Sequence, residues 1–172
     1  MTKHKITIID YGLGNLMSVK RAIEFNGYDA EISSSKADIQ ESSHLIIPGV
    51  GSFPNAIKSL NKNFLNKLII NHAEKGMPIF GICLGMQLLA DKSYEGELSD
   101  GLGLISGKVE KLPKFDSHTR NLLKVPNIGW RKVSSPKNNE SIIVIKYPNL
   151  KSNIISLKEF FETFNFSIVQ SE

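Results

Sequence analysis

The sequence contains a single cysteine, Cys83, and this scarcity excludes several classes of protein. One thiol cannot form an intramolecular disulfide framework or a CxxC zinc site, and low cysteine usage fits a reducing compartment. The formal net charge is +4, yet no run of five or six basic residues occurs. The charge pattern therefore does not indicate a nucleic-acid-binding protein.

Long apolar runs are also missing. The run at residues 6–9 is shorter than the apolar segment of a signal peptide, and no stretch approaches the ~18 residues that span a membrane. We therefore expect a soluble, cytoplasmic protein that binds neither membrane nor nucleic acid, and we expect no metal or other cofactor. With 172 residues, 41% of them hydrophobic, residues 1–172 suit one domain.

Strand and helix patterns alternate along the first half of the chain. Buried strands are predicted at residues 6–9, 30–32, 45–47 and 79–82. Helices are predicted after Asn15, over 56–60 and 65–73, and from 86 to 91. Short strands follow at 104–105, 108–112 and 122–125. The alternation predicts an α/β fold, with a mostly parallel sheet covered by helices on both faces in three layers.

The strongest chemical signal is a G-x-C-x-G motif, which places Gly81 and Gly85 on either side of Cys83. It lies between a predicted strand and a predicted helix, as in a nucleophile elbow with cysteine in place of serine. A sharp turn there strains the nucleophile, and side chains at either glycine would collide with the chain. The thiol would sit at a helix N-terminus, where the dipole favours thiolate, and the Leu84 amide would face an oxyanion. The alternative interpretation is a buried structural cysteine.

Two glycine-containing loops follow other predicted strands. Residues 48–51 (Pro-Gly-Val-Gly) could turn an N–H inward as a second oxyanion donor, or could form an ordinary turn. Residues 10–15 do not fit the G-x-G-x-x-G dinucleotide motif, because Met17 stands where the third glycine belongs. A small-anion or interface loop is the better interpretation of 10–15, and Asp10 could be only a carboxylate at a strand end.

A cysteine hydrolase needs a base, normally histidine. His4 lies near the N-terminus, His44 opens a predicted strand at the end away from the other motifs, His72 is expected on a helix surface, and His118 lies in a polar loop. Each is more readily a solvated side chain than a base, although His118 stays a candidate.

Six motifs occur in order: residues 10–15, 48–53, 81–89, 95–96, 101–103 and 125–130. On these, the chain resembles the class I glutamine amidotransferases, which have a flavodoxin-like fold, and among them the glutaminase subunits of imidazole glycerol phosphate synthases. The resemblance covers roughly residues 5–133. It implies that Cys83 attacks L-glutamine, that the Gly51 and Leu84 amides form the oxyanion hole, and that Gln87 and Glu95 hold the α-amino acid end of the substrate. It also implies a heterodimer with a cyclase subunit that uses the ammonia in histidine biosynthesis.

The sequence departs from this family in two places. Asn127 and Arg131 stand where the family has histidine and asparagine, near the expected partner interface. Neither the family's His-Ser-Tyr strand nor its Q-F-H-P-E segment, which supplies the catalytic His and Glu, follows Trp130. The domain is therefore expected to be incomplete at its C-terminus.

Residues 133–172 form an atypical tail, since all 13 glycines of the chain lie at or before Gly129. A frameshift would explain the joint loss of the family's motifs. Genuine divergence is the alternative, favoured by the helical spacing of Leu157, Phe160, Phe161 and Phe164.

Three functional hypotheses remain open. The first is a glutaminase subunit for a cyclase, or a paralogue with the same chemistry that serves the amidation of surface-polysaccharide sugars. The second is a catalytically inactive, truncated scaffold that binds a partner. The third is a cysteine hydrolase that uses His118.

Overall fold

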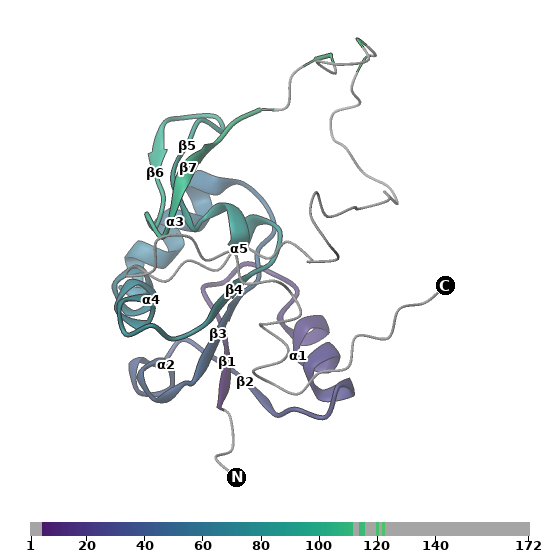
Figure 1. Cartoon of the computed structure of the whole chain (residues 1–172), viewed down its shortest axis with the longest axis vertical. Coiled ribbons are helices and arrows are strands. Elements are labelled where there is room, and N and C mark those ends of the chain that lie inside the picture. Colours follow the sequence, from purple (N-terminus) through teal and green to yellow (C-terminus); the bar gives the residue numbers. More distant parts are fainter. Residues whose placement is uncertain (1–4, 112–113, 116–119, 121, 123–172) are drawn as a thin grey trace.

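The structure is a computed structural model that describes residues 5–111, 114–115, 120 and 122. Its centre is a four-stranded parallel sheet in the order β2-β1-β3-β4 (Figure 1). The strands are β1 (Ile6–Ile9), β2 (Ala30–Ser33), β3 (His44–Ile47) and β4 (Ile79–Gly81). Every residue of β1 and β3 is buried, as expected for central strands that are covered on both faces. The four predicted strands are confirmed.

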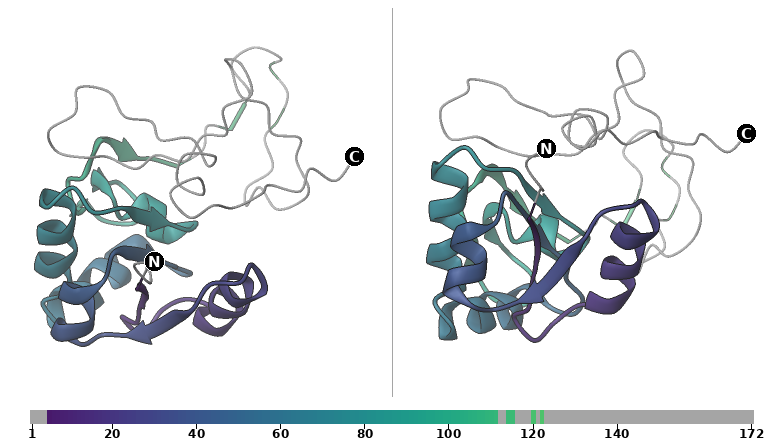
Figure 2. Two further views of the ribbon diagram at one scale, coloured as in Figure 1. Left: turned by 60° about the horizontal axis from the view of Figure 1, so that its bottom comes forward. Right: turned by 90° about the horizontal axis from the view of Figure 1, so that it is seen from below.

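Helices cover both faces of this sheet, as Figure 2 shows from two sides. The helices are α1 (Leu16–Phe25), α2 (Lys36–Glu41), α3 (Phe53–Lys62), α4 (Leu65–Glu74) and α5 (Leu84–Gln87). Side chains of β1 alternate between the two faces. Ile6 and Ile8 pack with residues of α1, whereas Ile9 joins the larger core formed with α2, α3 and α4. The predicted three-layer α/β architecture is therefore confirmed.

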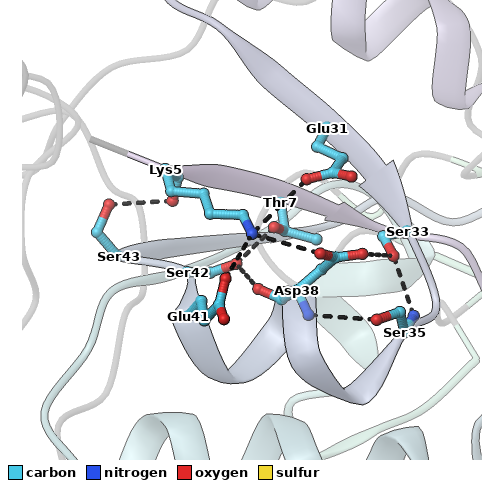
Figure 3. A network of polar contacts seen from close by, with 9 residues as sticks. All are labelled: Lys5, Thr7, Glu31, Ser33, Ser35, Asp38, Glu41, Ser42 and Ser43. Carbon is cyan, nitrogen blue, oxygen red and sulfur yellow. Dashed lines mark hydrogen bonds and ion pairs between the residues drawn. The ribbon is translucent and has the colours of Figure 1, made fainter. Parts of the chain in front are cut away.

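Helix α2 was not predicted, because Ile39 is its only buried residue and supplies no apolar period. Polar contacts add to the packing of Ile39 in the core. Ser35 caps its N-terminus by accepting from the Asp38 N–H at 3.3 Å. The Lys5 side chain, just before β1, points toward two acidic residues of α2 (Figure 3). Its Nζ lies 3.3 Å from Asp38 Oδ1 and 3.2 Å from Glu41 Oε2. Nearby, the Ser42 hydroxyl lies 2.5 Å from that of Thr7.

A second, three-stranded sheet follows α5. It consists of β5 (Ala90–Ser93), β6 (Ser99–Asp100) and β7 (Ile105–Val109) in the order β6-β5-β7. Strand β6 is antiparallel to β5, and β7 is parallel to it. One strand, β7, thus overlaps both of the strands predicted at 104–105 and 108–112 and joins them over residues 105–109. Leu122 forms only an isolated bridge to Phe115, and residues 123–125 lie outside the described residues.

The helix predicted over residues 86–91 is wrong, since α5 ends at Gln87 and β5 begins at Ala90. Backbone carbonyls of residues 88–91, which a continuing helix would use, accept from N–H groups of residues 101–105 instead. Gly101 permits this approach, because a Cβ there would collide with the Ala90 carbonyl oxygen. Tertiary pairing has therefore replaced the local helical preference. No helix in the described part of the chain combines the length and apolar character needed to cross a membrane.

Candidate active site at the carboxyl edge of the parallel sheet

Three segments meet where parallel strands end: Tyr11 after β1, residues 48–51 after β3, and Cys83 after β4. Because the strands are parallel, their carboxyl ends lie at one edge of the sheet. The register pairs Ile47 with Gly81, so the loops after β3 and β4 leave the sheet at the same level. Sequence-distant residues therefore come together here.

Cys83 occupies the sharp turn between β4 and α5. Its backbone has φ 56° and ψ −116°, a conformation that L-residues avoid at a cost of about 1–3 kcal/mol. The two flanking glycines allow the turn: a Cβ on Gly81 would lie 2.5 Å from Met86 Cα, and one on Gly85 would collide with the Ile47 carbonyl oxygen. The Cys83 side chain is exposed. The predicted geometry, a strained cysteine on a strand-to-helix turn enforced by glycines at ±2, is confirmed.

The helix that follows Cys83 is shorter than predicted. Helix α5 has only four residues, so it directs fewer peptide dipoles toward the sulfur than the expected longer helix would. Leu84 is its first residue and is buried. At this position an N–H has no acceptor within its own helix, which leaves it available to a ligand. The local backbone can therefore offer a donor next to the thiol.

The loop at residues 48–51 packs directly on the Cys83 turn. The Ile82 N–H donates to the Ile47 carbonyl at 2.9 Å. A Cβ on Gly49 would lie 2.7 Å from the Gly85 nitrogen and 2.9 Å from Leu84 Cβ, so only glycine fits between the two segments. Gly51 is exposed and has φ 98°, which favours glycine. The loop thus lies against α5 and ends in an accessible, left-handed residue.

Tyr11, which the sequence analysis left without a role, lies beneath this loop. It is 1% exposed, and its hydroxyl donates to the Pro48 carbonyl at 2.6 Å. Burial raises the pKa of Tyr11 to about 12, and the negative charge of a Cys83 thiolate contributes to the rise. Asp10, by contrast, accepts from the Gly12 N–H at 3.0 Å, which fits a local turn at the strand end.

The two residues implied to hold substrate come from different elements. Gln87 is the last residue of α5, half-buried, one turn beyond Cys83. Glu95 lies in the turn between β5 and β6, and its Oε2 accepts from the Phe53 N–H at 3.1 Å. Phe53 begins α3 directly after the 48–51 loop. The carboxylate of Glu95 is therefore held beside the segment that carries Gly51.

The two described histidines lie away from Cys83. His44 begins β3, as predicted, so it stands at the amino edge of the parallel sheet. His72 was expected at the surface and this was wrong: it is 4% exposed, in the last turn of α4 before β4 begins. Burial lowers its pKa to about 4. Its spacing of three residues from buried Ile69 was the signal for the apolar face.

Several predicted features lie outside the described residues: His4, His118, the motif at 125–131 with Asn127 and Arg131, and the tail at 133–172. The expectations about them stay predictions.

Comparisons with known proteins point to one family. The family model described as "Glutamine amidotransferase class-I" matches residues 7–151. A solved structure described as "Crystal structure of glutamine amidotransferase" matches with a TM-score of 0.53 at 23% identity, and the match covers 60% of this chain and 55% of that one. At that identity the likeness shows a shared fold.

Curated relatives are more similar in sequence. "Imidazole glycerol phosphate synthase subunit HisH" of Caldanaerobacter subterraneus subsp. tengcongensis is 45% identical over 141 residues, which cover 82% of this chain and 66% of the relative. The protein of the same name from Methanosarcina barkeri is 46% identical over 129 residues, covering 75% and 60%. The chain thus spans somewhat less than two thirds of the length of these relatives. The family match includes Tyr11, the 48–51 loop and the Cys83 turn, and the chain belongs to the class I glutamine amidotransferases.

Proposed function

We propose that this chain is a glutaminase subunit that releases ammonia from L-glutamine for a cyclase partner. The observation that carries the proposal is the Cys83 turn: an exposed thiol, held at positive φ, packed against a glycine loop from the neighbouring strand. Strain of this kind persists only where the surrounding structure imposes it, and it gathers at active sites. The relatives that carry the HisH name support the choice of pathway.

In the proposed reaction, the Cys83 sulfur attacks the side-chain carbonyl carbon of glutamine. The carbonyl oxygen becomes an oxyanion, which the Gly51 and Leu84 amides stabilise by hydrogen bonds. Collapse of this intermediate breaks the C–N bond, and the nitrogen leaves as ammonia after it takes up a proton. Water then hydrolyses the glutamyl thioester, giving glutamate and the free thiol. No cofactor enters either step.

Gln87 and Glu95 are proposed to bind the α-amino acid end of glutamine. A carboxylate is the natural partner of the substrate ammonium group, and such charged hydrogen bonds are the stronger ones. Glu95 already accepts from the Phe53 N–H, but a carboxylate has about four lone-pair sites and can accept a second donor. Its bond to the start of α3 would keep it directed at the site.

A catalytically inactive scaffold is the second candidate, favoured by the position of the described histidines. His44 and His72 lie at the amino edge, and a positioned acid–base contributes about 10² to 10⁴-fold. A thiol alone can form an adduct slowly but would turn over poorly. This second candidate therefore predicts that the chain hydrolyses little or no glutamine, with or without a cyclase. A paralogue that serves surface-polysaccharide sugar amidation would use the same chemistry with another acceptor.

The test is glutamine hydrolysis by the full chain, with and without a cyclase subunit of an imidazole glycerol phosphate synthase, in wild type and Cys83→Ala. If the chain is a glutaminase subunit, wild type should form glutamate, and the rate should rise when the cyclase is added. Glutamate formation should disappear in Cys83→Ala. The matched control is Ser43→Ala, a small-residue change at the amino edge of the sheet, where the Ser43 hydroxyl donates to the Lys5 carbonyl. Complex formation without glutamate formation would support the inactive scaffold. Steady turnover by the chain alone would show that a base has been overlooked.

A further inference from the structure

Tyr11 is buried at the carboxyl edge, and the proposed reaction assigns it no step. It follows β1, and both its ends are anchored. The hydroxyl donates to the Pro48 carbonyl at 2.6 Å, and the Tyr11 backbone carbonyl accepts from the Ser59 hydroxyl of α3. A polar group that is buried this deeply needs a partner, and here the Pro48 carbonyl provides it.

The hydroxyl reaches the peptide that touches the Cys83 turn. A Cβ on Gly49 would lie 2.7 Å from the Tyr11 hydroxyl oxygen, 2.7 Å from the Gly85 nitrogen and 2.9 Å from Leu84 Cβ. Gly49 is thus held between the tyrosine on one side and α5 on the other. Because a peptide unit is planar, fixing the Pro48 carbonyl also fixes the direction of the Gly49 N–H.

We propose that Tyr11 is a positioning residue, whose hydroxyl holds the 48–51 loop in the orientation that presents the Gly51 amide to an oxyanion formed at Cys83. The effect on an oxyanion at Cys83 rests on the proposed function. The positioning of the loop by Tyr11 does not depend on glutamine chemistry. Val50 and Gly51 are exposed, so residues further along the loop have little packing of their own. The buried Pro48–Tyr11 bond therefore anchors the loop at its first residue.

The protonation state of Tyr11 agrees with this role. Its pKa is raised to about 12, first by burial and then by the charge of a Cys83 thiolate. The Tyr11 hydroxyl therefore stays protonated over the pH range in which a cysteine enzyme works. It remains a hydrogen-bond donor to the Pro48 carbonyl throughout.

The test compares full-length wild type, Tyr11→Phe and Thr7→Val. Tyr11→Phe removes one hydroxyl and keeps the ring, so the Pro48 carbonyl loses its donor. Thr7→Val is the matched control, because it removes another buried hydroxyl, one that lies within β1 and contacts Ser42 instead of Pro48. Two quantities are measured: amide hydrogen exchange of the peptide covering residues 47–53, and alkylation rates of Cys83.

Alkylation uses two reagents. The rate with iodoacetamide depends only on how accessible the Cys83 sulfur is and on how much of the thiol is ionised. L-2-amino-4-oxo-5-chloropentanoate has the shape of glutamine and a ketone at the reacting position; the sulfur forms a bond to its terminal carbon and chloride leaves. Tyr11→Phe is expected to speed exchange of residues 47–53 at least fivefold and to slow the glutamine-shaped reagent about tenfold, while iodoacetamide changes less than twofold. Thr7→Val should change neither quantity in this region.

Unchanged exchange in Tyr11→Phe, or equal slowing with both reagents, would overturn the positioning role. The same result in Thr7→Val would also overturn it, because the effect would then be general loosening of the fold. If wild type shows no preference for the glutamine-shaped reagent, the proposed function fails, and the exchange measurement still decides whether Tyr11 positions the loop.

Discussion

The two edges of the parallel sheet are built differently. At the amino edge, polar groups pair with one another: Lys5 contacts Asp38 and Glu41, and the hydroxyls of Thr7 and Ser42 meet. Gly27 and Gly76 occupy the left-handed positions after α1 and α4, and a positive φ costs little free energy at a glycine. At the carboxyl edge, the left-handed position before α5 is taken by Cys83 itself, although a glycine would fit the backbone better.

This contrast separates stability from function. A strained non-glycine residue, with glycines packed tightly on either side, is an arrangement that a fold gains nothing from keeping unless the side chain is used. The amino edge needs no such arrangement, and its residues are explained by pairing and packing alone. Changes at the two edges should therefore differ in the size of their effect on stability and in its physical cause.

The largest expected effect is that of Gly85→Ala at the carboxyl edge. The new methyl group would collide with the Ile47 backbone, which cannot move without breaking the sheet. We expect a loss of about 3–5 kcal/mol in the free energy of unfolding, or no folded protein. Urea unfolding measures it. Gly96→Ala is the control: Gly96 has a positive φ of 74° but open space around it, so the loss there should stay near 1 kcal/mol. Equal losses in the two variants would contradict the packing seen here.

The next effect belongs to the amino edge and depends on pH. The pKa of His72 falls from 6.5 in the unfolded chain to about 4 in the folded one, mainly through burial. Between these values the unfolded chain takes up a proton that the folded chain refuses, so stability is full above about pH 6.5 and falls toward pH 4. The loss reaches about 3 kcal/mol. Unfolding measured from pH 7 to 4 should show a steeper loss in wild type than in His72→Leu, and parallel curves would refute the assignment.

Cys83 and His72 show what the sequence could and could not predict. The Cys83 turn was predictable because the glycines that permit it stand beside it in the chain. The burial of His72 follows from its place on the apolar face of α4, a local pattern that was overlooked. Helix α2 could not be predicted, since it buries only Ile39 and shows no apolar period. The bond from Tyr11 to Pro48 could not be predicted either, since it joins residues 37 positions apart. The end of α5 also depends on distant bonds, from residues 101–105.

A smaller effect, of opposite sign, is expected at Cys83. Cys83→Gly relieves the positive φ, whereas Cys83→Ala keeps the strain and removes the same sulfur. We expect the glycine variant to be more stable than the alanine variant by about 0.5–1 kcal/mol, after allowing for the greater freedom of glycine in the unfolded chain. Thermal unfolding of the pair measures this difference. A more stable alanine variant would mean that the turn carries no strain.

The smallest effect is expected from Lys5→Gln. The Lys5 side chain is partly solvated, and exposed ion pairs contribute little because water and salt screen them. Its ion pairs raise the pKa of Lys5, the Glu41 hydrogen bond most. We expect the unfolding midpoint to shift slightly, and the shift to shrink further in high salt. A large, salt-independent shift would place this cluster among the main determinants of the fold.

The most direct test of the central claim, that Cys83 is the nucleophile toward glutamine, is acid-quench mass spectrometry of the full chain after incubation with L-glutamine. Neither histidine that the structure describes lies at Cys83 to speed hydrolysis of the thioester, so a glutamyl adduct should accumulate on the peptide that contains Cys83. It should be absent with D-glutamine and in Cys83→Ala. An adduct confined to Cys83 is the predicted result. No adduct after long incubation, with Cys83 still open to iodoacetamide, would contradict the account.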